Sequence, residues 1–194
     1  MSLKNILPYG GEAYYFRDVF DEAESELLFQ DLQKQVPWKH ESVKLFGKEI
    51  MQPRLTAWFG DADKPYTYSG LTLQPGSWTN TLLRIKEASD RLSGVISTSA
   101  LLNLYRGGTD YMGWHRDNEK MLGKSPVIAS VSFGCPRTFQ FRDYHSKKNI
   151  LSIELQPGSV LIMKGESQQQ WEHRLPKQRT VAGVRINITF RVIQ

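Results

Sequence analysis

The feature that most constrains the fold of this chain is a strict alternation of apolar and polar residues near residue 190. Between Val184 and Arg191 the polar positions are Arg185, Asn187, Thr189 and Arg191. Because successive side chains of a strand point to opposite faces of a sheet, the segment is predicted to be a β-strand with one apolar and one polar, cationic face. Two interpretations of the polar face stay open: it is solvated, as in many half-buried strands, or it lines a site.

The second half of the chain contains further strand signals. Short runs rich in Val, Ile and Phe are separated by Gly, Pro and Asn, which is typical of strands joined by turns. The predicted strands span residues 101–105, 127–133, 138–142, 151–155, 159–163 and 184–193.

The first half predicts helices. Asp21, with Glu24 three residues later, is a capping-box signature, and a helix is expected from there to about Val36, with Leu27, Leu28 and Leu32 facing the core. A second helical stretch is expected from Ser77 to Gly94, and its apolar residues are Trp78, Leu82, Ile85 and Leu92. Helices early and strands late favour an α+β fold in which the helices cover one face of a β-sandwich or open barrel.

The tripeptide His115-Arg116-Asp117 is a candidate metal motif. In an extended segment, side chains two apart share a face, so His115 and Asp117 can bind one ion, and His173 can supply a third ligand. Two histidines and one carboxylate form the facial triad of non-heme Fe(II) oxygenases, which leaves positions open for a cosubstrate and O2. Taken alone, such a tripeptide is more often a polar surface segment or a satisfied histidine with no metal nearby.

The arginines of the alternating strand suggest the cosubstrate. Arg185 and Arg191 share a face, and an arginine can bind a carboxylate through paired, charge-assisted hydrogen bonds. Two such groups near a ferrous ion suit a dicarboxylate, for which 2-oxoglutarate is the candidate.

A series of motifs resembles the AlkB family of Fe(II)/2-oxoglutarate-dependent nucleic-acid demethylases. In chain order they are Asn103-Leu-Tyr105, His115-Arg-Asp117, Ser130-Val-Ser132-Phe-Gly134, Gly158-Ser159, His173-Arg-Leu-Pro176 and Arg185-x-Asn187-x-Thr189-Phe-Arg191. Earlier segments are similar to the branch of that family that repairs duplex DNA, namely Val43 to Lys48, Pro53-Arg54 and Tyr66 to Leu73. The first forty or so residues match more loosely.

The resemblance implies a double-stranded β-helix of the jelly-roll type, as one domain over residues 1–194 with residues 41–75 as the nucleotide-recognition region. It implies that His115, Asp117 and His173 hold the catalytic Fe(II). It also places 2-oxoglutarate against Asn103, Tyr105, Arg185, Asn187, Thr189 and Arg191. The implied reaction uses O2 to remove methyl groups from 1-methyladenine and 3-methylcytosine in double- or single-stranded DNA, releasing formaldehyde, succinate and CO2.

The resemblance further implies that a flipped base stacks between Tyr68 and His115, with Tyr66 on the same strand face. It also implies that Leu45-Phe46-Gly47 forms a hydrophobic finger that fills the gap left in the duplex. Without the resemblance, the tyrosines are equally well half-exposed strand residues, and Phe46 equally well a core residue of a hairpin.

Charged residues near these motifs are candidates for substrate contacts. Asn118-Glu119 departs from the Asp-Glu pair typical of the branch, which leaves Glu119 as the carboxylate for a cationic base. Candidate phosphate contacts are Arg54, Arg137, Arg142, Lys147 and Lys148.

Composition supports a polyanionic partner. The formal net charge is +5 and the isoelectric point is about 9.3, and cationic side chains gain affinity for phosphates through counterion release. Cys135 is the one cysteine, so no intramolecular disulfide is expected, and no run approaches the about eighteen apolar residues needed to cross a bilayer. We therefore expect a protein of the cytoplasm, or of the nucleus of a eukaryote, without membrane contact. The family resemblance and the lack of a dimerisation heptad predict a monomer.

Two alternatives stay open. The iron chemistry can act on methylated RNA or on a protein side chain instead of DNA. The chain can also be a jelly-roll module that binds nucleic acid without catalysis, although a pure binder has no need of iron ligands beside two arginines.

Overall fold

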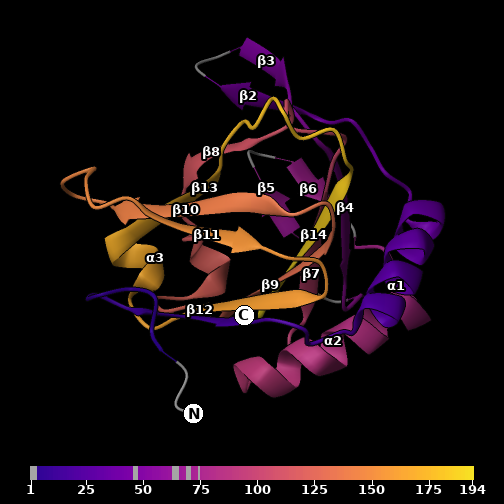
Figure 1. The fold of residues 1–194 in the computed structure, drawn as a ribbon, viewed down its shortest axis with the longest axis horizontal. Coiled ribbons are helices and arrows are strands. Elements are labelled where there is room, and N and C mark those ends of the chain that lie inside the picture. Colours follow the sequence, from indigo (N-terminus) through magenta and orange to yellow (C-terminus); the bar gives the residue numbers. More distant parts are fainter. Residues whose placement is uncertain (1–3, 46–47, 63–65, 69–70, 74) are drawn as a thin grey trace.

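The computed structural model describes residues 4–45, 48–62, 66–68, 71–73 and 75–194. Two antiparallel sheets form the body of the molecule (Figure 1). The larger sheet has the strand order β1 (Glu12–Phe16), β12 (Ser159–Lys164), β9 (Ile128–Gly134), β14 (Arg185–Arg191), β7 (Ser99–Tyr105) and β4 (Leu55–Gly60). The smaller has the order β11 (Leu151–Leu155), β10 (Arg137–Asp143), β13 (Trp171–Leu175) and β8 (Met112–His115). The predicted jelly-roll architecture is confirmed.

Two hairpins extend this body. They are β2 (Ser42–Leu45) with β3 (Lys48–Met51), and β5 (Tyr66–Tyr68) with β6 (Leu71–Leu73). Short helical turns, α3 (Ser167–Gln170) and η1 (Lys120–Leu122), lie in connections between strands. The described residues include no helix that is long and apolar enough to cross a membrane.

Helix α1 (Glu22–Gln35) has the predicted bounds. The Asp21 carboxylate caps it by accepting a hydrogen bond from the Glu24 backbone N–H at 2.8 Å, but the Glu24 carboxylate pairs with Arg84 instead of returning to the cap. Leu28 is buried as expected, whereas the prediction for Leu27 is wrong, because its side chain is 65% exposed. One residue turns an α-helix by about 100°, so Leu27 and Leu28 cannot share a narrow apolar stripe.

Helix α2 (Asn80–Ser93) begins later than the predicted Ser77, because Thr79 caps it by accepting from the Leu82 backbone N–H at 3.2 Å. It ends at Gly94, which adopts the left-handed conformation (φ 77°) that glycine accommodates readily. Both long helices lie at one side of the molecule in Figure 1, and their apolar residues pack with the larger sheet in one core cluster. The expectation that the helices cover one face is confirmed.

All the strands predicted in the second half of the chain exist with small shifts of their ends, but β1, β4, β8 and β13 of the two large sheets were not among them. The structure distinguishes the two interpretations of the polar face of β14, which were a solvated face and a face that lines a site. All its residues are buried, because the apolar face packs under the helices and the polar face is turned into the space between the two sheets. A solvated polar face is therefore the wrong interpretation.

Arg137 corrects a second expectation, since it was a candidate phosphate contact. Its side chain is fully buried, and its guanidinium donates to the backbone carbonyls of Gly107 (3.1 Å), Asp110 (3.0 Å) and Pro176 (2.8 Å). Burial also lowers the pKa of Arg137. The residue joins two loops to β10 and cannot reach a phosphate outside the protein.

Arg137→Met is therefore expected to lower the free energy of unfolding by about 3 kcal/mol, because three buried carbonyls lose their donor. Chemical denaturation of the variant measures this change. Lys148→Met, on an exposed turn, is the matched control and should change stability by less than about 0.5 kcal/mol. Equal stability of the two variants would contradict this role of Arg137.

Candidate metal centre and its pocket

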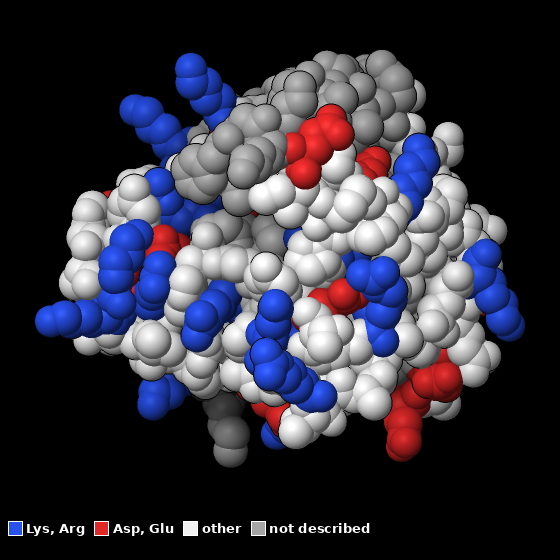
Figure 2. All heavy atoms as spheres, turned by 90° about the horizontal axis from the view of Figure 1, so that it is seen from above, with Lys and Arg blue, Asp and Glu red and all other residues white. Residues whose placement is uncertain are grey.

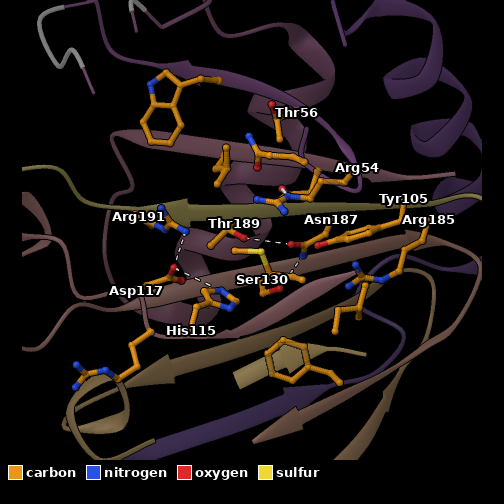
Figure 3. A pocket seen from close by; sticks show the side chains of 18 of the residues that line it. Arg54, Thr56, Tyr105, His115, Asp117, Ser130, Arg185, Asn187, Thr189 and Arg191 are labelled. Atoms are coloured by element: carbon orange, nitrogen blue, oxygen red, sulfur yellow. Dashed lines mark hydrogen bonds and ion pairs between the residues drawn. The ribbon is translucent and has the colours of Figure 1, made fainter. Parts of the chain in front are cut away.

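The three predicted metal ligands meet between the sheets. His115 ends β8 and lies opposite His173 in the neighbouring strand β13, while Asp117 follows β8 by two residues. One potential ligand atom from each residue lies within 4.8 Å of the others. The Nε2 atoms of His115 and His173 are each 4.0 Å from an oxygen of Asp117, and Figure 3 shows His115 and Asp117 turned toward each other.

The protonation states of the imidazoles fit a divalent metal. Burial lowers the pKa of His173 to about 3, with a further contribution from His115, so this imidazole is neutral. His115 Nδ1 lies 2.9 Å from the carbonyl oxygen of Gly113, and a carbonyl only accepts, so Nδ1 donates this bond and Nε2 is the nitrogen available to bind a metal. Two imidazole nitrogens and a carboxylate are donors that suit Fe(II).

Asp117 is held in its ionised form. Burial by itself would raise the pKa of this carboxyl group, but the neighbouring guanidinium of Arg191 holds it below its ordinary value. Arg191 Nη2 donates to Asp117 Oδ1 at 2.9 Å, and the Asp117 backbone N–H donates to Oε1 of buried Gln168 at 3.0 Å. Sequence reasoning missed Gln168, because a bond to a backbone N–H leaves no pattern in side-chain chemistry.

The polar face of β14 forms the floor of a cavity of about 150 Å³ that His115 and Asp117 also line. Asn187 Nδ2 donates to Ser130 Oγ at 2.8 Å, and Thr189 Oγ1 donates to Asn187 Oδ1 at 3.2 Å (Figure 3). The structure brings together in this cavity all the residues predicted to bind the cosubstrate, which are Asn103, Tyr105, Arg185, Asn187, Thr189 and Arg191.

The two arginines of β14 are not equivalent. Arg191 is paired with Asp117, whereas no carboxylate of the described residues lies within 4.0 Å of the Arg185 guanidinium. Arg185 Nη2 donates to Ser132 Oγ at 2.9 Å, and Nε is buried without a hydrogen-bond partner in the described chain. Burial lowers the pKa of Arg185 to about 10. A buried cation without a counterion fits a bound carboxylate.

The remaining cavity wall comes from strands of both sheets and from the segments that flank β4 and β8. Arg54 is 6% exposed, and its Nε donates to Asn103 Oδ1 at 2.7 Å. Arg54 therefore lies inside the cavity. The prediction that it contacts a phosphate at the surface is wrong, because a phosphate outside the protein cannot reach its buried guanidinium. Glu119 lines the same cavity, whereas Asn118 is exposed.

Some of the predicted substrate-binding residues are not described by the structure, or are described only by their backbone. Phe46 and Gly47 are outside the described residues. Of Leu45, Tyr66 and Tyr68 only the backbone is described, in β2 and β5.

The molecular surface carries the excess positive charge. Lys and Arg side chains predominate over Asp and Glu on the face shown in Figure 2. Two of the predicted phosphate contacts, Arg142 and Lys147, both form ion pairs with Glu172, while Lys148 is exposed. The face is cationic, but part of its charge is already compensated.

Comparison with known proteins adds independent findings. Residues 12–191 match the model of the 2OG-Fe(II) oxygenase superfamily. The chain is 39% identical over 183 residues to the alpha-ketoglutarate-dependent dioxygenase alkB homolog 3 of Bos taurus, covering 89% of this chain but only 63% of that protein. It is 38% identical over 185 residues to the DNA oxidative demethylase ALKBH2 of Homo sapiens, covering 90% of this chain and 71% of that protein. The structure of OsALKBH1 superposes with a TM-score of 0.64 at 17% identity, covering 95% of this chain and 99% of the other, which supports the fold.

Proposed function

Because the chain belongs to the AlkB family of the 2OG-Fe(II) oxygenase superfamily, we propose that it is a dioxygenase that demethylates N-alkylated bases in nucleic acid. The observation that carries the proposal is one cavity lined both by His115 and Asp117, which cluster with His173, and by Arg185, whose guanidinium has no carboxylate partner among the described residues. One end of this cavity suits a ferrous ion and the other a carboxylate, which matches the cofactor and cosubstrate of the superfamily.

The side chains of the cavity have distinct roles in this proposal. His115, Asp117 and His173 hold Fe(II), which when bound supplies, with O2 and 2-oxoglutarate, the oxidising power to hydroxylate an N-methyl group. Arg191 keeps Asp117 ionised and oriented, and Arg185 binds a carboxylate of 2-oxoglutarate. The hydroxymethyl product releases formaldehyde, while the cosubstrate leaves as succinate and CO2.

The remaining predicted cosubstrate residues orient 2-oxoglutarate along the floor of the cavity. Asn187 is fixed by hydrogen bonds to Ser130 Oγ and to the Val131 carbonyl at 3.0 Å, so its position is set before the cosubstrate arrives. Asn103 lies opposite Asn187 in the register of β7 and β14, and Tyr105 lies opposite Arg185. A prearranged set of polar groups lowers the entropy lost when the cosubstrate binds.

We propose DNA as the substrate, with 1-methyladenine and 3-methylcytosine as the lesions, in double and single strands. The metal ligands lie between two sheets, so a base inside a duplex must flip out to reach them. Tyr68 and His115 then stack on the base, Tyr66 borders it, and Leu45, Phe46 and Gly47 fill the gap, within a recognition region of residues 41–75. The basic surface supports a polyanionic partner, and we propose a monomer acting in the cytoplasm, or in the nucleus of a eukaryote.

The test is formaldehyde release and base restoration on oligonucleotides that contain one 1-methyladenine, offered as single-stranded DNA, duplex DNA and RNA. We expect repair of DNA that requires both Fe(II) and 2-oxoglutarate and that falls as salt rises, because salt weakens phosphate binding. Consumption of 2-oxoglutarate without repair of DNA would support RNA or protein as the target. Absence of any turnover would support a non-catalytic binding module.

A further inference from the structure

Glu41 contributes a carboxylate to the cavity that the reaction described above does not use. Its segment runs beside β4, since Lys39 exchanges two backbone hydrogen bonds with Thr56, at 2.8 and 2.9 Å. The Gln52 backbone N–H donates to the Glu41 carbonyl at 3.0 Å. Thr56 Oγ1 then donates to Glu41 Oε2 at 3.0 Å, and Thr56 itself is only 5% exposed. The carboxylate is therefore placed by ordered backbone on both sides.

Glu41 lines the cavity beside strand β4. Thr56 lies opposite Asn103 in the register of β4 and β7, and Asn103 lies opposite Asn187 in that of β7 and β14. Glu41 thus extends the polar row that starts at the proposed cosubstrate residues and ends at the edge strand β4. The edge strand of the other sheet is β8, which carries His115, so the cavity reaches the side where the two sheets separate.

The charge of Glu41 is not compensated by a described side chain. No Lys, Arg or His whose side chain is described lies within 4.0 Å of its carboxylate, and Arg54, which lines the same cavity, directs its Nε to Asn103. The hydroxyl of Thr56 is a neutral donor. With Glu119 on the segment that follows β8, the cavity has carboxylates from two of its walls.

We propose that Glu41, positioned by Thr56, makes the cavity select cationic alkylated bases over neutral ones. This inference rests on the proposed demethylase function and names a residue that sets its specificity. 1-Methyladenine and 3-methylcytosine carry a positive charge and an exocyclic N–H donor, both of which favour a carboxylate. 1-Methylguanine and 3-methylthymine are neutral and carry a carbonyl oxygen at the ring position where the cationic bases carry the amino group, so they gain no charge-assisted bond.

The experiment compares kcat/KM for 1-methyladenine with kcat/KM for 1-methylguanine in the same single-stranded oligonucleotide. Glu41→Gln keeps an oxygen that can accept from Thr56 but removes the charge. We expect the ratio of cationic to neutral lesion to fall about tenfold, mainly through KM for the cationic lesion. Glu87→Gln, exposed on α2, loses the same charge outside the cavity and should leave the ratio unchanged.

Thr56 provides a second pair of variants. Thr56→Val removes the hydroxyl and should lower the ratio of cationic to neutral lesion by a smaller factor than Glu41→Gln does. Thr56→Ser keeps the hydroxyl and should have the wild-type ratio. Binding of both oligonucleotides to the Mn(II)-loaded protein, measured by fluorescence anisotropy, should show the same loss of preference without turnover.

The outcomes separate the two proposals. Wild-type protein that repairs lesions, with an unchanged ratio in Glu41→Gln or an equal loss for both lesions, would overturn the role of Glu41 alone. Wild-type protein that repairs neither lesion would overturn the proposed function and this inference with it.

Discussion

Replacing His115 with alanine is expected to abolish Fe(II)-dependent consumption of 2-oxoglutarate while leaving the metal-free protein as stable as the wild type. The imidazole is one of three potential metal ligands. Loss of a group that only hydrogen-bonds to a metal ligand lowers metal affinity by up to about 100-fold, so loss of the ligand itself should lower it further. The side chain is 27% exposed, and Asp117, 4.0 Å away, is its one charged partner among the described residues. Metal affinity is measured by equilibrium titration with Mn(II), and stability by denaturation in a chelator.

Asp117→Asn is the informative comparison, because it should lose metal and stability together. Arg191 would remain buried without the carboxylate that now lies 2.9 Å from its Nη2. Removal of one partner of a buried ion pair typically lowers the free energy of unfolding by about 3–5 kcal/mol. Wild-type metal affinity in His115→Ala would show that the metal is bound elsewhere. A fully stable Asp117→Asn would show that the ion pair contributes little.

Replacing Arg185 with methionine should have two effects of opposite sign. Affinity for 2-oxoglutarate should fall by about 100-fold or more, because a buried charged pair with the cosubstrate is lost. The protein without ligand should become more stable, since a fully buried guanidinium with no carboxylate within 4.0 Å among the described residues is replaced by an apolar side chain of similar length. Equilibrium binding of 2-oxoglutarate to the Mn(II)-loaded protein and denaturation of the metal-free protein measure the two effects.

Arg191→Met is the matched control on the same face of the same strand. It also removes a buried guanidinium, but it leaves Asp117 unpaired, so the ligand-free protein should lose stability where Arg185→Met gains it. Arg185→Lys should recover part of the binding, because it restores the charge without the paired donors of a guanidinium. Unchanged 2-oxoglutarate affinity in Arg185→Met would contradict the assignment of this residue.

Local patterns in the chain were enough to predict much of this architecture. The alternation in β14, the apolar runs of β7, β9 and β12, and the Asp21 and Gly94 signals at helix ends all have short-range causes, namely the periodicity of the backbone and the satisfaction of its hydrogen bonds. For the same reason, His115 and Asp117 were expected to act together. The spacing of His173 carried no such information, and its place beside His115 depends on the pairing of β8 with β13.

Contacts between residues that are far apart in the chain could not be predicted from such local patterns. Arg137 and Arg54 looked like any basic surface residues, and their burial follows from loops and strands that meet around them. Arg185 and Arg191 occupy equivalent positions in the alternation, yet one meets Asp117 and the other meets no carboxylate in the described chain. Periodicity assigns a side chain to a face of a strand, whereas its charge environment depends on which residues the opposing sheet and its loops bring to that face. That distribution of partners, set by packing over long sequence separations, pairs Arg191 with Asp117 and leaves Arg185 without a carboxylate among the described residues, which is why we propose different roles for the two arginines.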